Sequence, residues 1–274
     1  MKNSQNVVRS QVNIQPVFRL VDFFEETTEY ERNWQLPFNS LALCVRDDPE
    51  DPSWIELPEK NCRIYYEANV PYFTTCDTPM RIRYTPANRH FCIHFRYELF
   101  PGVDLFSGIR ERYILKDKQL PDKIKSVFSD PDPLRRLARA EAVTMAMLLD
   151  FWPKHLPLDL HKALDFGEFF QYVRKNLDCR IGIPEMAAIM GWSEAHFSRV
   201  FHSVFHITPK QYLVRELFAR ALGLLNDPGK SIKEISAELG FSSEFNFSRF
   251  IKQYSGQAPS QLRRTASGPL YVRK

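Results

Sequence analysis

The sequence predicts an α+β protein with a strand-rich front half and an all-helical C-terminal third. Three observations lead to this class. The chain has 274 residues, more than one small core needs. Up to about Leu120 it consists of short β-branched and aromatic runs broken by Pro, Asn and Asp. Beyond Asp130, apolar residues recur at spacings of three and four, which is the helical period.

The composition is that of a folded, soluble protein. Apolar residues make up 44% of the chain, aromatic residues 14% and charged residues 26%. The polar start has no apolar leader, and no run of about 18 apolar residues occurs, so we expect a cytoplasmic protein that does not contact a membrane. Five cysteines without a C-x-x-C pair favour buried thiols over a disulfide framework or a zinc site: Cys44, Cys62, Cys76, Cys92 and Cys179.

Charge is distributed unevenly along the chain. From Phe166 to Lys274 there are 15 Lys and Arg against 9 Asp and Glu, a net charge of +6, whereas the remainder carries −2. This asymmetry predicts a polyanion as partner of the C-terminal part alone.

The front half breaks into several candidate strands: VFRLVDFF, SLALCV, RIYYEA, MRIRYT and HFCIHFRYELF. Short strands separated by turn residues predict a β-sandwich or small barrel. A helix with an apolar stripe follows from Leu134 to Trp152, and it either docks on this domain or pairs with the same helix of a second chain. The segment WPKHLPLDLHK, with two prolines, is typical of a linker. We therefore expect a front domain over 1–153, a linker over 154–164 and a C-terminal domain over 165–274.

The C-terminal domain contains an internal repeat. IPEMAAIMGWSEAHFSRVFHSVFHITPKQYL recurs about fifty residues later as IKEISAELGFSSEFNFSRFIKQYSGQAPSQLR, with one extra residue in the second copy. Each copy reads as two short helices joined through a glycine, which predicts helix-turn-helix units over 184–205 and 232–254. We expect N-caps at Ser193 and Ser242, a capping box from Ser231 to Glu234, and left-handed Gly191 and Gly240.

The outward face of each second helix is the candidate DNA-reading surface. It carries Glu194, Ala195, Ser198, Arg199 and His202 in the first copy, and Glu244, Phe245, Ser248, Arg249 and Lys252 in the second. An arginine at the same place in both copies matches the bidentate reading of guanine. A rigid helix through KQYLVRELFARALGLL, capped by Thr208 and opened by Pro209, would hold the two units roughly 34 Å apart, one turn of duplex DNA.

With these features, the region from about Leu164 to Arg264 resembles the DNA-binding domain of the AraC/XylS family of regulators. The resemblance rests on A-x-x-x-G-[WF]-S…F-S-R, on the ending F-x-x-x-[FY]-x-x-x-x-P and on the doubled arrangement of the region. It implies that Ala195, Ser198 and Arg199, and in the second unit Phe245, Asn246, Ser248 and Arg249, reach bases or nearby phosphates. The sequence departs from the pattern at His206, where glycine is usual and is retained as Gly256, and at Ile183, a poor residue for a helix cap.

The resemblance also implies a cupin-like front barrel that binds a small molecule, often a sugar, and a dimerisation element. The implied partners are double-stranded DNA, a sugar-like effector, a second copy of the chain and RNA polymerase, with activation of transcription as one outcome. Residues that suit a sugar pocket are aromatic or charged, and the candidates are Tyr65, Arg81, Arg83, His90 and His94.

Two other functions are weighed against a ligand-responsive regulator. His90 and His94 share one face of a strand, as metal ligands of some cupin enzymes do, but no His-x-His or suitably spaced carboxylate other than Glu98 accompanies them. An effector-independent architectural DNA protein is the second alternative. No nucleophile elbow, P-loop or dinucleotide glycine motif occurs, so we expect no catalytic residues, no metal and no cofactor.

Overall fold

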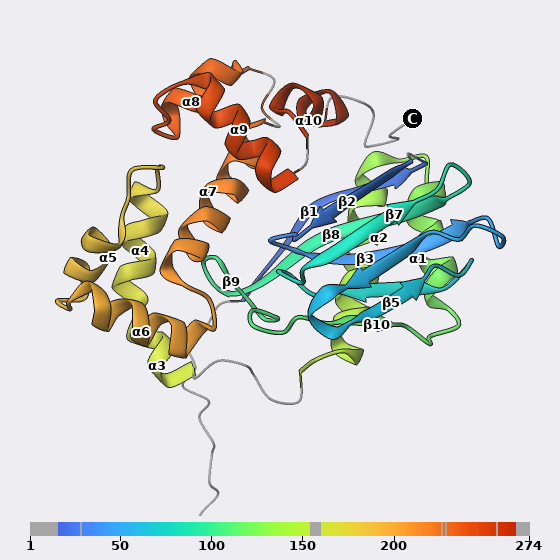
Figure 1. The fold of residues 1–274 in the computed structure, drawn as a ribbon, viewed down its shortest axis with the longest axis horizontal. Coiled ribbons are helices and arrows are strands. Elements are labelled where there is room, and N and C mark those ends of the chain that lie inside the picture. Colours follow the sequence, from blue (N-terminus) through green and yellow to red (C-terminus); the bar gives the residue numbers. More distant parts are fainter. Residues whose placement is uncertain are drawn as a thin grey trace, which may run out of the picture.

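The computed structural model describes residues 16–27, 29–153, 160–225, 227, 229–255 and 257–266. A pair of antiparallel sheets forms the N-terminal part, and helices form the C-terminal part, so the predicted fold class is confirmed (Figure 1). Among the residues described, no helix combines the length and apolar character that crossing a membrane requires.

The two sheets face one another as a sandwich, and neither closes into a full barrel. The larger sheet has the order β1-β8-β3-β6-β10 with β9 paired to β8, and the smaller one has the order β2-β7-β4-β5. The strands are β1 Val17–Glu26, β2 Tyr30–Trp34, β3 Asn39–Arg46, β4 Trp54–Leu57, β5 Cys62–Tyr65, β6 Pro71–Thr74, β7 Met80–Tyr84, β8 Arg89–Phe100, β9 Val103–Asp104 and β10 Arg112–Ile114.

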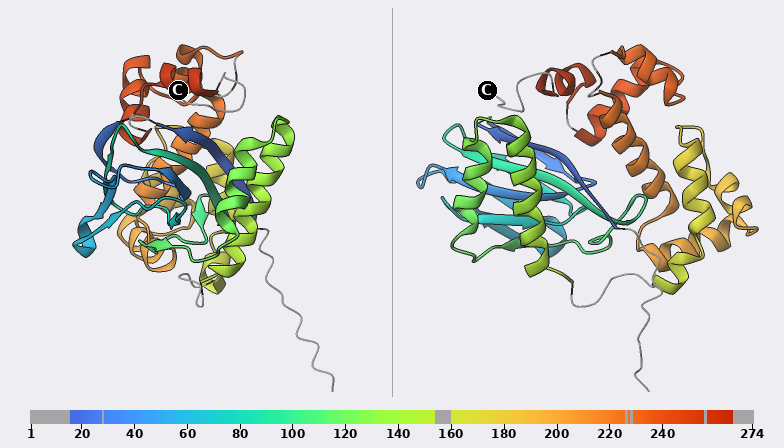
Figure 2. Two further views of the ribbon diagram at one scale, coloured as in Figure 1. Left: turned by 90° about the vertical axis from the view of Figure 1, so that its right-hand side faces the viewer. Right: turned by 180° about the vertical axis from the view of Figure 1, so that it is seen from behind.

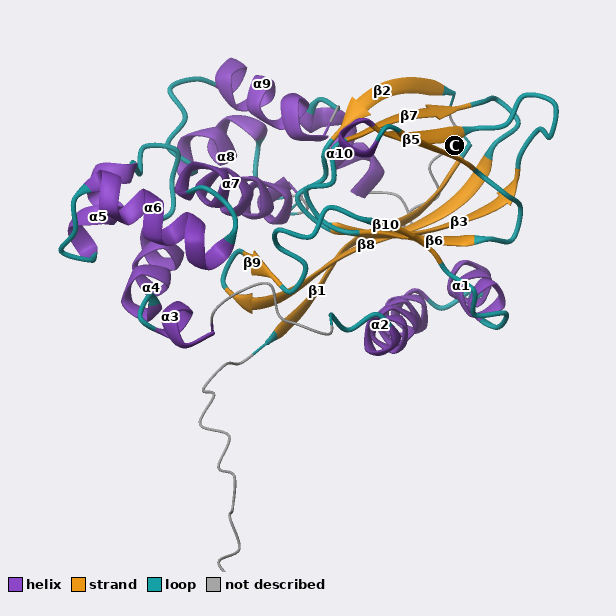
Figure 3. Cartoon of the chain, turned by 60° about the horizontal axis from the view of Figure 1, so that its bottom comes forward, coloured by secondary structure: helices purple, strands orange, loops and turns teal. Residues whose placement is uncertain are grey.

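Two helices cover the outer face of the larger sheet: α1 (Leu120–Ser129) and α2 (Pro133–Asp150) (Figure 3). Asp132 caps α2 by accepting hydrogen bonds from the backbone N–H groups of Leu134 and Arg135. Because helices lie on one face and the second sheet on the other, β8 is buried almost throughout instead of alternating.

The C-terminal part is all-helical, as predicted. Its helices are α3 Leu160–Leu164, α4 Gly167–Asn176, α5 Ile183–Ile189, α6 Glu194–Phe205, α7 Pro209–Leu225, α8 Ile232–Glu238, α9 Glu244–Ser255 and α10 Pro259–Ala266. Helix α7 runs between the group α4–α6 and the group α8–α10 (Figure 2). The predicted linker falls largely on residues 154–159, outside the described residues.

The two parts share one hydrophobic core. The phenyl ring of Phe100, at the end of β8, stacks on Phe170 of α4 with ring centroids 5.5 Å apart, and meets Phe205 of α6 at 6.3 Å. Buried apolar residues continue without interruption from Phe23 in the sandwich to Tyr212 in α7. The helical part is therefore packed against the sandwich and not merely tethered to it.

The prediction for the cysteines was correct in part. Cys44, Cys76 and Cys92 are buried, but Cys62 and Cys179 are exposed. All five are free thiols, and burial raises the pKa of Cys44 and Cys76 to about 12. The exposed pair lies at a strand start and in the loop after α4, positions that the composition of the chain does not reveal.

Candidate nucleic-acid interface

The first helix-turn-helix unit consists of α5 and α6. Gly191 supplies the left-handed residue of the turn, with φ +66°, and Ser193 caps α6 by accepting a hydrogen bond from the His196 N–H. The cap of α5 is Gly182, with Ile183 and Pro184 in the first turn, so the expectation of Ile183 as cap was wrong. Glycine is an acceptable N-cap, so the start of α5 does not depend on isoleucine as a capping residue.

The helix α6 ends at a strained but intact position. His206 has φ 55° and ψ 18°, and its backbone N–H donates to the His202 carbonyl. This is the left-handed cap that the family pattern gives to glycine, and histidine holds it here. The corresponding Gly256 lies outside the described residues.

The second unit consists of α8 and α9. Ser231 and Glu234 form the predicted capping box, and Gly240 has φ +77° in the turn. The predicted cap at Ser242 was wrong. Ser243 accepts the Asn246 N–H, while the Ser242 hydroxyl accepts from the Asn246 side chain at 2.7 Å. The extra residue of the second copy is thus taken up before the helix begins.

Matching the two caps aligns α6 and α9 residue by residue from Glu194 and Glu244. Phe197 and Phe247 are both fully buried, and Phe201 and Ile251 follow one turn later. The opposite faces match as well, because both arginines are exposed and both serines are half-buried at equivalent positions. The predicted DNA-contacting side chains on these faces are exposed or half-buried: Glu194, Ala195, Ser198, Arg199 and His202, then Phe245, Asn246, Ser248, Arg249 and Lys252.

Helix α7 joins the two units as one continuous rod of 17 residues. The Thr208 hydroxyl accepts the Gln211 N–H at 3.1 Å, which confirms the predicted cap. Tyr212 is fully buried toward the first unit, and Phe218 and Leu225 are buried toward the second. The separation of the units is therefore fixed by packing along the whole rod.

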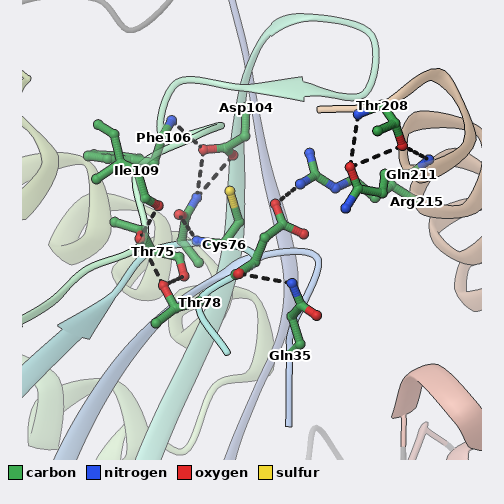
Figure 4. Close-up of polar contacts among 12 residues, drawn as sticks. Gln35, Thr75, Cys76, Thr78, Asp104, Phe106, Ile109, Thr208, Gln211 and Arg215 are labelled. Carbon is green, nitrogen blue, oxygen red and sulfur yellow. Dashed lines mark hydrogen bonds and ion pairs between the residues drawn. The ribbon is translucent and has the colours of Figure 1, made fainter. Parts of the chain in front are cut away.

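Helix α7 is also anchored to the sandwich by buried charges. Arg215 forms an ion pair with Asp77, in the turn after β6, and its side chain is 6% exposed. Asp77 is held in turn by Gln35, which donates to its carbonyl oxygen at 3.0 Å, so Arg215 meets a fixed partner (Figure 4). Burial lowers the pKa of Arg215 from its ordinary value.

A second buried network lies beside this pair. Arg96 on β8 is 3.1 Å from Glu98 and 3.2 Å from Glu216 on α7. Burial raises the pKa of Glu216 above its ordinary value, while Arg96 opposes that shift. Sequence reasoning missed Arg215 and Glu216, and the available signal was a pair of adjacent charges inside an otherwise apolar helical stretch.

The candidate effector residues do not form one site. Arg81 and Arg83 lie on the smaller sheet, where they pair with Glu31 and Asp51 at the surface, and Tyr65 is 50% exposed at the end of β5. His90 and His94 instead point together into the space between the sheets, as their spacing predicted.

The space between the sheets is filled by side chains. The Nδ1 of His90 lies 2.6 Å from the Asn88 carboxamide oxygen, and the ring of His90 stacks on Tyr84 at 4.1 Å. His94 is paired with Asp22 at 2.7 Å. The remaining cavity has a volume of about 20 Å³, the size of one water molecule. No cluster of three or more His, Cys, Asp or Glu suited to a metal occurs in the described part of the chain.

A much larger cleft of about 860 Å³ lies between the sandwich and the helical part. Its walls come mainly from β1, β8, α4 and α7, with further residues from α3 and the β2–β3 loop, and they are mainly apolar, with Leu20, Phe38 and Phe218 among them. Five arginines and two glutamates also border it: Arg19, Arg96, Arg174, Arg215, Arg220, Glu98 and Glu216. The volume lies within the range of ordinary small-molecule sites.

Comparison with known proteins places the repeat region in a family. A family model described as a helix-turn-helix domain matches residues 186–265. The HTH-type transcriptional regulator YidL of Escherichia coli K12 is 36% identical over 87 residues, which are 32% of this chain and 29% of that protein. The Msm operon regulatory protein of Streptococcus mutans is 30% identical over 82 residues, 30% of each chain. The match thus spans about a third of these relatives.

Solved structures extend the likeness to the whole fold. ToxT from Vibrio cholerae superposes with a TM-score of 0.60, covering 92% of this chain and 99% of that one at 9% identity. A ToxT structure with a bound unsaturated fatty acid gives 0.58 at 9% identity, covering 94% and 98%. At this identity the likeness establishes the arrangement of a sandwich followed by two helix-turn-helix units. Residues 186–265, in the C-terminal part of the chain, therefore form a helix-turn-helix domain of the AraC type.

Proposed function

We propose that the chain is a sequence-specific DNA-binding transcriptional regulator whose activity responds to a small molecule. The observation that carries the proposal is the pair of matched recognition faces on α6 and α9, held at a fixed separation by α7. The C-terminal region carries a net charge of +6, which suits a phosphate backbone. Arg199 and Arg249 are exposed at equivalent positions and match bidentate contacts to guanine.

Selection of random duplex DNA on the full chain at about 0.15 M salt tests this proposal. We expect one motif with two half-elements about one turn apart. Recovery of unrelated sequences with similar affinity would instead identify an architectural DNA protein, and recovery of nothing would refute DNA binding.

We place the effector in the 860 Å³ cleft beside α7, because the space between the sheets has room for about one water molecule. An apolar wall bordered by five arginines against two glutamates suits an amphiphilic carboxylate better than a sugar. The fatty acid bound to ToxT supports the same class. A sugar-like effector remains a prediction, and sugars are therefore included in the test below.

The test measures the melting temperature of the protein with a panel of sugars and of medium- and long-chain carboxylates. Ala219 lies on α7 in the wall of the cleft, so Ala219→Leu narrows the cleft without weakening the helix. We expect a carboxylate to raise the melting temperature of the wild type, and Ala219→Leu to abolish that rise. A rise that is equal in both proteins would exclude the cleft, and a rise with sugars alone would exclude carboxylates.

We also propose that the chain works as a homodimer through α2. Its outer face exposes Leu134 by 76% and Leu149 by 70%, with Leu137 less exposed, and Trp152 follows just after the helix. An apolar stripe of this kind on a helix suits a self-complementary two-fold contact. Analytical sedimentation of the wild type and of the double variant Leu134→Glu/Leu149→Glu tests this proposal. We expect the wild type to sediment as a dimer and the variant as a monomer. A monomeric wild type would contradict the proposal. Activation through RNA polymerase remains a prediction.

A further inference from the structure

On their outward faces, the two recognition helices differ most in side-chain size at one position, the second residue after the cap. With Ser193 and Ser243 matched as caps, Glu194 corresponds to Glu244, and Ala195 corresponds to Phe245. Further along the two faces, serine and arginine occupy the same places. The second unit therefore presents a phenyl ring where the first unit presents a methyl group.

The ring of Phe245 is not used by the fold. It is 73% exposed, and it has no ring contact with any residue that the structure describes. The other phenylalanines of this unit form the interior, where Phe241 lies 5.4 Å from Phe247 and 5.3 Å from Phe250 between ring centroids. An apolar side chain left in water on a polar face gains free energy when a partner covers it.

The position of Phe245 narrows the choice of partner. It lies in the first turn of α9, and the exposed Arg249 follows one turn later on the same face. Residues in the first turns of a recognition helix contact base edges in the major groove. The only apolar group on those edges is the C5-methyl of thymine.

We propose that Phe245 reads a thymine methyl in the half-element bound by the second unit. This inference rests on the proposed function. It makes the two half-elements unequal, because the short Ala195 of the first unit reaches less far toward the base edges. The operator of this protein is then asymmetric, and the thymine whose methyl group is contacted lies in the half-element bound by α9.

Deoxyuridine substitution tests the inference, since it removes the methyl group and leaves base pairing unchanged. Each thymine of the selected operator is replaced singly, and binding is measured for wild type and Phe245→Ala. We expect one thymine in the second half-element at which deoxyuridine weakens the wild type about fourfold, ~0.8 kcal/mol for one buried methyl. In Phe245→Ala the same substitution has no effect, because the coupling has been removed. Thymines of the first half-element are the control, and their response is the same in both proteins.

Three outcomes separate the possible failures. A wild type that selects no operator overturns the proposed function, and this inference with it. If the wild type binds its operator, but no deoxyuridine substitution affects the wild type more than Phe245→Ala, this inference alone is overturned. A Phe245→Ala variant that binds like wild type but transcribes less in a purified polymerase assay assigns the ring to a protein contact, and also overturns it.

Discussion

Arg96 on β8 donates a hydrogen bond to Glu216 on α7 across 3.2 Å, and both side chains are more than four-fifths buried. The contact joins the sandwich to the helix that spaces the two helix-turn-helix units. Any change that moves β8 or loosens this contact therefore acts on the element that sets the separation of the units. A ligand in the neighbouring cleft, which both residues line, would meet this contact directly.

The pH dependence of the interface follows from Glu216. Burial holds its pKa above the ordinary value of 4.5, so the folded state binds this proton more tightly than the unfolded state. The resulting stabilisation is complete below pH 4.5 and is lost as pH rises through the raised pKa. Glutamine does not ionise, so we expect Glu216→Gln to remove this pH-dependent loss of stability. The free energy of unfolding of the variant should therefore rise relative to that of the wild type as pH increases. Denaturant unfolding of both proteins from pH 4.5 to 8 measures it, and parallel curves would contradict it.

The ion pair of Arg215 and Asp77 is buried, so breaking it on one side is costly. Arg215→Met leaves the Asp77 carboxylate without its partner and is expected to destabilise by ~3–5 kcal/mol. The double variant Arg215→Met/Asp77→Asn restores much of that loss, since asparagine tolerates the positive φ of 57° at this turn. A matched control is Arg83→Met, which breaks an exposed pair with Asp51 and should cost less than about 1 kcal/mol. Equal losses in the single and double variants would show that the two residues are not coupled.

At Gly102 the backbone of the sandwich comes close to α7. It has φ +73°, and an added Cβ would lie 2.5 Å from Tyr212 Cε2 and 2.7 Å from Glu216 Cδ. We expect Gly102→Ala to lower the free energy of unfolding by at least about 1–2 kcal/mol from backbone strain alone. Gly223→Ala, in α7 with no atom near its Cβ, should instead stabilise by ~0.5–1 kcal/mol. Calorimetric melting of the two variants checks the contrast, and a loss for Gly102→Ala no larger than the backbone strain would contradict the contact between the β8–β9 turn and α7.

The recognition arginines and Lys252 should differ in what they recognise. Arg199→Ala and Arg249→Ala are expected to weaken operator binding by ~1–3 kcal/mol each and to relax sequence choice at one base. Lys252→Ala should weaken all sequences about equally and reduce the slope of log affinity against log salt by about 0.9. Binding isotherms on operator and scrambled duplexes at several salt concentrations separate these cases. Uniform loss across sequences for the two arginines would assign them to phosphates.

The repeated unit was the most predictable part of the chain, because local residues determine its turns. Gly191, Gly240 and the capping box at Ser231 depend on nearest neighbours, and all three were predicted correctly. The cap at Ser243 was misassigned because two serines stand side by side, and only the packing of Phe247 decides which of them begins the helix.

The effector region could not be predicted in the same way, because it depends on contacts between distant segments. Arg81 and Arg83 read like pocket residues, yet the register of β7 turns them outward to pair with surface carboxylates. The cleft is lined by residues from β1, β8, α3, α4 and α7, which lie far apart in the sequence. Arg215 and Glu216 likewise acquire their partners from residues more than a hundred positions away.

The most direct test of the account is the dependence of DNA affinity on the spacing of the two half-elements. Because α7 is a packed helix of fixed length, both units engage DNA only when the half-elements lie on one face of the duplex. Inserting about five base pairs between them turns one half-element by half a turn, and we expect affinity to fall to that of a single half-element. Affinity that does not change on insertion would mean that the two units do not bind DNA together, and would contradict the central claim.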